Sequence, residues 1–166
     1  MKKTIRTVID TDVFINAMFS NDEACKEVFY LERDKKIVVF MNDEMYYELI
    51  DVIMSRLRSG NLTAEQIIQI CNILFFRIWE IKRIPRSDYR KICIEDENDD
   101  KLFDCAIDGK VDYIISCNTR HVFGYEELLE KKYRVTLKIM EPESFLSEYE
   151  TRNLSPFQQV LKGMNT

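Results

Sequence analysis

Two aspartates follow a short apolar run near the start of the chain, Thr7-Val8-Ile9-Asp10-Thr11-Asp12. β-Branched residues of this kind favour a strand, and we predict one over residues 4–9. In parallel α/β sheets, ligands bind in the crevice beyond the carboxyl ends of the strands. The run therefore predicts a buried strand that presents Asp10 to a binding site. We interpret Asp12 as the cap of the helix that follows, with a role in the same site as the alternative.

The remainder of the chain alternates predicted strands with predicted helices. The further predicted strands are residues 36–41, 112–117 and 133–139, with a short one between 80 and 95. The predicted helices are residues 13–19, 22–33, 43–58, 64–79, 99–109 and 142–149. This alternation predicts an α/β fold, a three-layer α/β/α sandwich with a mostly parallel central sheet. We expect residues 1–150 to form a single domain and residues 151–166 to form a C-terminal tail that docks loosely as a helix.

Composition and charge argue against several classes of protein. The 166 residues carry a net charge of −5, which disfavours a protein that coats nucleic acid without sequence preference. The five cysteines contain no Cys-x-x-Cys pair, which disfavours a zinc ribbon and favours reduced, buried thiols. No stretch approaches the roughly 18 apolar residues of a membrane span, and the N-terminus is too short for a signal-peptide core before the first strand. We therefore expect a cytoplasmic protein without a membrane partner.

Several further polar residues lie at the ends of predicted strands and helices or on the core-facing side of a helix. Glu48 lies on the core-facing side of its helix, where a charged side chain is rare unless it coordinates a metal or forms an ion pair, here with Arg56 or another cation. Asp99 opens a helix, Asp104 follows about one turn later, and Asn118 follows a predicted strand. A fold that gathers carboxylates against their mutual repulsion usually binds a hard cation such as Mg²⁺ or Mn²⁺. The predicted metal ligands are Asp10, Glu48, Asn118 and Asp104, together with one or two members of the acidic run at residues 95–100.

A basic stretch surrounds Trp79 and Tyr89. Cations beside aromatic rings suit a nucleic-acid strand, whereas the alternative is a solvated loop around a buried tryptophan. The predicted substrate-binding residues are Lys82, Arg83, Arg86 and Arg120. His121 is the only histidine, and no nucleophile pattern adjoins it, which argues against nucleophilic catalysis.

Taken in order, these motifs resemble those of the PIN-domain family, and most closely the PIN-type toxin components of bacterial toxin–antitoxin systems. The similar segments are residues 8–17, 44–49, 96–106, 111–118 and 140–146, which read VIDTDVFINA, EMYYEL, DENDDKLFDCA, VDYIISCN and MEPESFL. The resemblance covers residues 4–148. Asn118 departs from the family pattern, which commonly has an aspartate at this position.

The resemblance implies a single-stranded RNA endonuclease that uses Mg²⁺ or Mn²⁺. Asp10, Glu48 and Asp99 would be its catalytic residues and would hold one or two cations, which activate water and offset charge on the scissile phosphate. Asn118 contributes no negative charge, so the metal would bind more weakly unless Asp104 compensates. The resemblance also implies an antitoxin protein that covers the acidic pocket. The apolar helix at residues 64–79 would form a dimer surface or pack into the core.

Two other functions stay open. The segment Asp10-Thr11-Asp12-Val13 has the DxD form of haloacid-dehalogenase-type phosphatases, in which the first aspartate is the nucleophile. The order of motifs disagrees with that class, because Ser116 follows the acidic run that it should precede. Asn118 instead favours a module that has kept the fold and binds RNA or protein without cleaving it.

Overall fold

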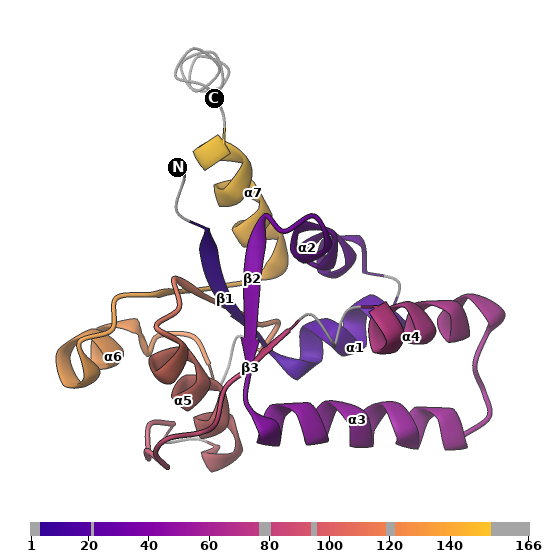
Figure 1. The fold of residues 1–166 in the computed structure, drawn as a ribbon, viewed down its shortest axis with the longest axis horizontal. Helices are drawn as coiled ribbons and strands as arrows, with labels where there is room; N and C mark the ends of the chain where they lie inside the picture. The colour runs from indigo at the N-terminus through magenta and orange to yellow at the C-terminus, as the bar shows by residue number, and fades with distance from the viewer. Residues whose placement is uncertain (1–3, 21, 77–80, 94–95, 119–121, 154–166) are drawn as a thin grey trace.

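The computed structural model of the chain describes residues 4–20, 22–76, 81–93, 96–118 and 122–153 (Figure 1). Within these residues, five strands form one sheet in which every neighbouring pair is parallel, in the order β3-β2-β1-β4-β5. The strands are β1 (Ile5–Ile9), β2 (Ile37–Met41), β3 (Lys82–Arg83), β4 (Tyr113–Ile115) and β5 (Lys138–Met140). The predicted parallel sheet is confirmed.

The centre of the sheet is also the point at which the strand order reverses. β2 pairs with one edge of β1, and β4 pairs with the other edge. The pairing of Ile9 with Ile115 brings the carboxyl ends of β1 and β4 side by side. The backbone N–H of Asp10 then donates to the carbonyl of Ile115 at 2.9 Å, beyond the last residue of β1. The residues after β1 and β4 therefore share the crevice where ligands bind in open α/β sheets.

Helices cover both faces of the sheet. They are α1 (Thr11–Phe19), α2 (Glu23–Arg33), α3 (Asp43–Arg58), α4 (Ala64–Phe76), α5 (Asp100–Gly109), α6 (Glu126–Tyr133) and α7 (Pro142–Asn153). Figure 1 shows α5 and α6 on one side of the sheet and α1, α2 and α7 on the other, with α3 and α4 forming a hairpin that extends away from it. The fold is the predicted three-layer α/β/α sandwich.

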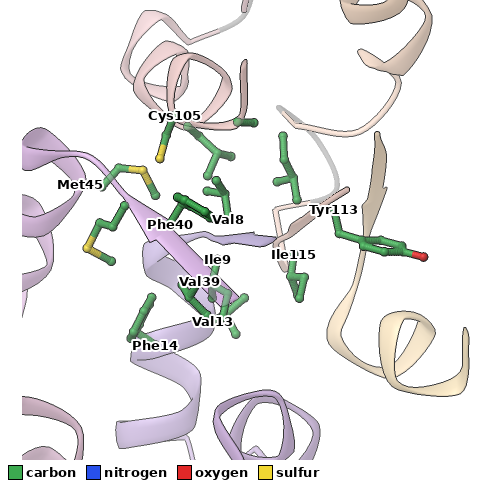
Figure 2. Packing of buried hydrophobic residues seen from close by; sticks show 14 of the residues in the cluster. Val8, Ile9, Val13, Phe14, Val39, Phe40, Met45, Cys105, Tyr113 and Ile115 are labelled. Carbon is green, nitrogen blue, oxygen red and sulfur yellow. The ribbon is translucent and has the colours of Figure 1, made fainter. Parts of the chain in front are cut away.

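Apolar side chains cover both faces of the sheet, as expected where helices bury it on each side (Figure 2). Val8 and Phe40 point toward α5, where Cys105 lies, whereas Ile9 points to the opposite face, toward Val13 of α1. All five of these side chains are buried. Because successive residues of a strand face opposite sides, this alternation fixes which side chains reach each layer.

The region between β4 and β5 differs from the sequence prediction. Residues 133–139 were expected to form a strand, but Tyr133 is the last residue of α6, and Arg134 ends that helix with a left-handed backbone, φ 57°. Helix α6 buries Leu129 and has lysines in its last turn, where the negative end of the helix dipole favours them. Within residues 133–140, only Lys138–Met140 pairs with β4.

The chain also departs from the prediction near its C-terminus. Helix α7 continues to Asn153, into the predicted tail, and the rest of that tail lies outside the described residues. Helix α4 ends at Phe76, and residues 77–80 of the predicted helix lie outside the description as well. No helix in the described ranges combines the length and the apolar character needed to cross a membrane.

Candidate active site

A cavity of about 320 Å³ opens beyond the carboxyl ends of β1 and β4. Carboxylates, two amides, one hydroxyl and one ammonium group line it together with apolar side chains. The polar lining residues central to the site are Asp10, Asp12, Glu48, Asp99, Asn118 and Lys101. Four of the five predicted metal ligands therefore meet at one cavity, although they lie on four separate segments of the chain.

Asp10 is the N-cap of α1, and both oxygens of its carboxylate accept hydrogen bonds. Its Oδ1 accepts a hydrogen bond from the backbone N–H of Thr11 at 2.7 Å, and its Oδ2 accepts one from the hydroxyl of Ser116 at 2.8 Å. Burial raises the pKa of Asp10 above its usual value, against the lowering effect of these two hydrogen bonds. The interpretation of Asp12 as the cap of this helix is wrong, because Asp10 is itself the cap.

Asp12 faces the loop that follows β4. Its two carboxylate oxygens lie 3.0 and 3.2 Å from the backbone N–H of Cys117, which donates to them. Burial, and then the nearby charge of Asp10, raise the pKa of Asp12 to about 7. Asp12 is thus part of the site, as the alternative interpretation of the sequence held, and its spacing from Asp10 was the signal for it.

Ser116 connects the two carboxylates to the loop. Its side chain is buried, and its oxygen accepts from the backbone N–H of Asn118 at 2.9 Å while its hydroxyl donates to Asp10. Ser116 therefore fixes the start of the segment that carries Asn118. The sequence analysis did not identify it as a site residue, and its position directly after an apolar strand was the signal available.

Glu48 approaches the cavity from α3 and is held by two partners. Its Oε2 accepts from the hydroxyl of Thr11 at 2.9 Å, and its Oε1 accepts from the ammonium of Lys101 at 3.0 Å. The alternative interpretation, an ion pair with Arg56 or another cation, is met by Lys101, whereas the guanidinium of Arg56 lies over the ring of Phe19. The sequence analysis did not identify Lys101, whose partner lies 53 residues away along the chain.

Asn42 sets the relative position of the helices that carry Glu48 and Lys101. Its side-chain oxygen accepts from the backbone N–H of Met45 at 2.9 Å and so caps α3. Its side-chain N–H₂ donates to the carbonyl of Lys101 at 2.7 Å. A single buried amide thus ties the first turn of α3 to the first turn of α5.

The chemistry of the lining residues suits a hard divalent cation. Carboxylate and amide oxygens are the ligands that Mg²⁺ and Mn²⁺ prefer. Burial, and to a smaller extent the charge of a neighbouring acid, raises the pKa values of Asp10 and Asp12, and a bound cation would offset both effects. In the described part of the chain, however, no three His, Cys, Asp or Glu side chains lie close enough together to form a ready metal site. The carboxylates would have to draw together around an ion.

Asp104 is placed away from the cavity, which corrects its prediction as a metal ligand. Its side chain is 0% exposed, and its carboxylate accepts from Arg86 Nε at 2.6 Å and from Arg90 at 2.9 Å. Asp100, four residues earlier, accepts from the backbone N–H groups of Ile92 and Cys93. The two aspartates do share one face of α5, but that face packs against residues 86–93.

The predicted substrate-binding residues fall into different environments. Arg86 is committed to ion pairs with Asp104 and Glu44 and is largely buried. Lys82 and Arg83 are exposed on the edge strand β3, where Arg83 lies 3.9 Å from the centre of the Tyr46 ring and pairs with Asp43. Arg120 lies outside the described residues, as do Trp79 and His121.

The comparisons with known proteins agree with this geometry. No curated protein matches the chain. A family model described as a PIN domain matches residues 6–120, which is more than half of the chain. The matched range includes β1, α3, α5 and β4, and with them all the polar residues of the cavity. The chain therefore belongs to the PIN-domain family.

Proposed function

We propose that the protein is an endoribonuclease that cleaves single-stranded RNA with the help of Mg²⁺ or Mn²⁺. PIN domains are generally nucleases, which is the starting point for this proposal. The observation that carries it is the convergence of Asp10, Asp12, Glu48, Asp99 and Asn118 on one cavity at the point where the strand order reverses. The phosphatase alternative is set aside, because the family model that matches the chain is a PIN domain.

Asp10, Glu48 and Asp99 would hold the cation, with Asn118 contributing its amide oxygen. A cation there would supply a Lewis acid that activates water and offsets charge on the scissile phosphate. The remaining groups keep these ligands in position. Ser116 orients the Asp10 carboxylate, and Thr11 orients that of Glu48. The exposed cations of β3, Lys82 and Arg83, would contact the phosphates of the RNA beside the cavity.

A toxin role, with an antitoxin as partner, is the more specific form of the proposal. An acidic pocket of this kind accepts an inserted Arg or Lys side chain, which is how a partner protein would block it. Helix α4 exposes Ile67 and Ile68 while it buries Ile70. These exposed apolar side chains support a dimer or antitoxin contact on α4. A toxin of this kind would act in the cytoplasm.

Two observations favour a second candidate, a module that binds RNA or protein without cleaving it. Asn118 supplies no charge, and Lys101 already pairs with Glu48. Both features reduce the negative charge available to a metal ion.

A cleavage assay on Glu48 separates the two candidates. Wild type, Glu48→Gln and the matched control Asp51→Asn, an exposed aspartate on the same helix, would be incubated with labelled single-stranded RNA in Mn²⁺ or in EDTA. We expect metal-dependent cleavage by wild type and Asp51→Asn, and a loss of about 100-fold or more in Glu48→Gln. Equal cleavage by wild type and Glu48→Gln, or cleavage in EDTA, would overturn the proposal, and RNA binding without cleavage would favour the second candidate.

A further inference from the structure

Lys101 brings a positive charge into a cavity whose other charged lining residues are all acids. Its ammonium lies 3.0 Å from Oε1 of Glu48, and its side chain is only 18% exposed. It lines the same cavity as Asp10 and Asp99. The ammonium thus contacts one of the carboxylates that the proposed function assigns to a divalent cation.

The backbone of Lys101 is anchored, so this contact does not depend on a mobile loop. Lys101 lies in the first turn of α5, and its carbonyl accepts a hydrogen bond from the buried side chain of Asn42. Asn42 also caps α3, the helix that carries Glu48. Asn42 therefore ties the two helices together, and rotation of the Lys101 or Glu48 side chain would separate the pair without moving either helix.

A divalent cation and this ammonium compete for the same oxygen. Mg²⁺ and Mn²⁺ bind carboxylate oxygens at about 2.1 Å, so an ion on Glu48 would lie within a few Å of the ammonium in its present position. Two positive charges at such a distance in a partly buried site repel strongly. An ion that takes Oε1 would therefore require the ammonium to leave that oxygen first.

We propose that Lys101 is an internal counter-ion of the carboxylate cavity, and that a divalent cation must displace its ammonium from Glu48 in order to bind. The inference rests on the proposed metal-dependent function and deepens it. Lys101 would set the concentration of divalent metal that is needed to fill the site. In the absence of metal, Lys101 lowers the repulsion among the acids and keeps Glu48 in place.

Metal titration without RNA tests this directly. Wild type, Lys101→Met, the charge-preserving Lys101→Arg and the control Lys131→Met would be titrated with Mn²⁺, with free Mn²⁺ followed by electron paramagnetic resonance and the melting temperature followed in parallel. Lys131 pairs with Glu127 on the exposed surface of α6, so its replacement removes the same charge far from the cavity lining. We expect Lys101→Met to bind Mn²⁺ on the order of 10- to 100-fold more tightly than wild type. Lys101→Arg should bind no more tightly than wild type, and Lys131→Met should match it.

Coincident Mn²⁺ titrations for wild type and Lys101→Met would overturn the inference. Weaker binding by Lys101→Met would overturn it as well, because Lys101 would then only position Glu48. Absence of binding in both proteins would overturn it as well. Metal binding by Lys101→Met alone would support it. Lys101→Gln gives the same comparison if Lys101→Met does not fold. The proposed function fails separately, if the metal-saturated wild type cleaves no RNA.

Discussion

Replacing Asp12 with Asn should make the stability of the protein less dependent on pH. Burial and the charge of Asp10 raise the pKa of Asp12 to about 7 in the folded protein, whereas an unfolded chain leaves it near 3.8. Asparagine keeps an oxygen that can accept the hydrogen bond of the Cys117 backbone N–H, but it cannot ionise. The substitution therefore removes the titration and preserves the principal contact.

The sign and size of the effect follow from the difference in proton binding. Between pH 4 and pH 7 the folded protein holds a proton on Asp12 that the unfolded chain has released, so this group makes the protein less stable as the pH rises. The shift is about three pKa units, and each unit corresponds to about 1.4 kcal/mol. Asp12 should therefore cost the wild type about 4 kcal/mol between pH 4 and pH 8.

Urea unfolding at several pH values, in EDTA, measures this cost. The free energy of unfolding of Asp12→Asn, relative to that of wild type, should rise by about 4 kcal/mol from pH 4 to pH 8. Asp51→Asn, which changes an exposed aspartate of α3, should follow the wild type throughout. If wild type and Asp12→Asn changed in parallel with pH, Asp12 would titrate normally and the account of crowded, buried acids would be refuted.

Two further predictions separate the acids of the cavity from the acid that supports the fold. Asp104→Asn should lower the free energy of unfolding by about 3–5 kcal/mol, because Arg86 and Arg90 lose a buried partner. The midpoint of a Mn²⁺ binding titration should stay unchanged. A shifted midpoint with an unchanged free energy of unfolding would contradict the placement of Asp104 away from the cavity. Asn118→Asp should bind Mn²⁺ about 10-fold more tightly in a calorimetric titration, because it adds a carboxylate to the cavity; weaker or equal binding would mean that Asn118 does not face the ion.

The sequence was informative about features that depend on local pattern. Apolar strands that end in polar residues identified Asp10 and Asn118, and helical spacing identified Glu48. Because all the strands are parallel, their carboxyl ends meet at one edge, and residues far apart in the chain were correctly expected to converge there. The order of the motifs also resembled the PIN-domain family, to which the chain belongs.

The errors concern contacts that no local pattern encodes. Asp104 was grouped with the metal ligands because it shares a face of α5 with Asp100, but periodicity does not say what packs against that face. Lys101 and Glu48 meet across two helices that Asn42 ties together, a contact that neither helix's own pattern predicts. Helix α6 was missed because its length is short and its only fully buried side chain is Leu129, which leaves a weak apolar period.

The most direct test of the central claim is a paired titration of wild type and Asp10→Asn with Mn²⁺ and with Mg²⁺. Melting temperature and cleavage of a labelled single-stranded RNA would be followed in the same samples. The account predicts that metal stabilises the wild type and switches on cleavage, and that both effects are lost in Asp10→Asn, which keeps its oxygen for the cap of α1. Equal stabilisation and cleavage in the two proteins would contradict a metal site built on Asp10.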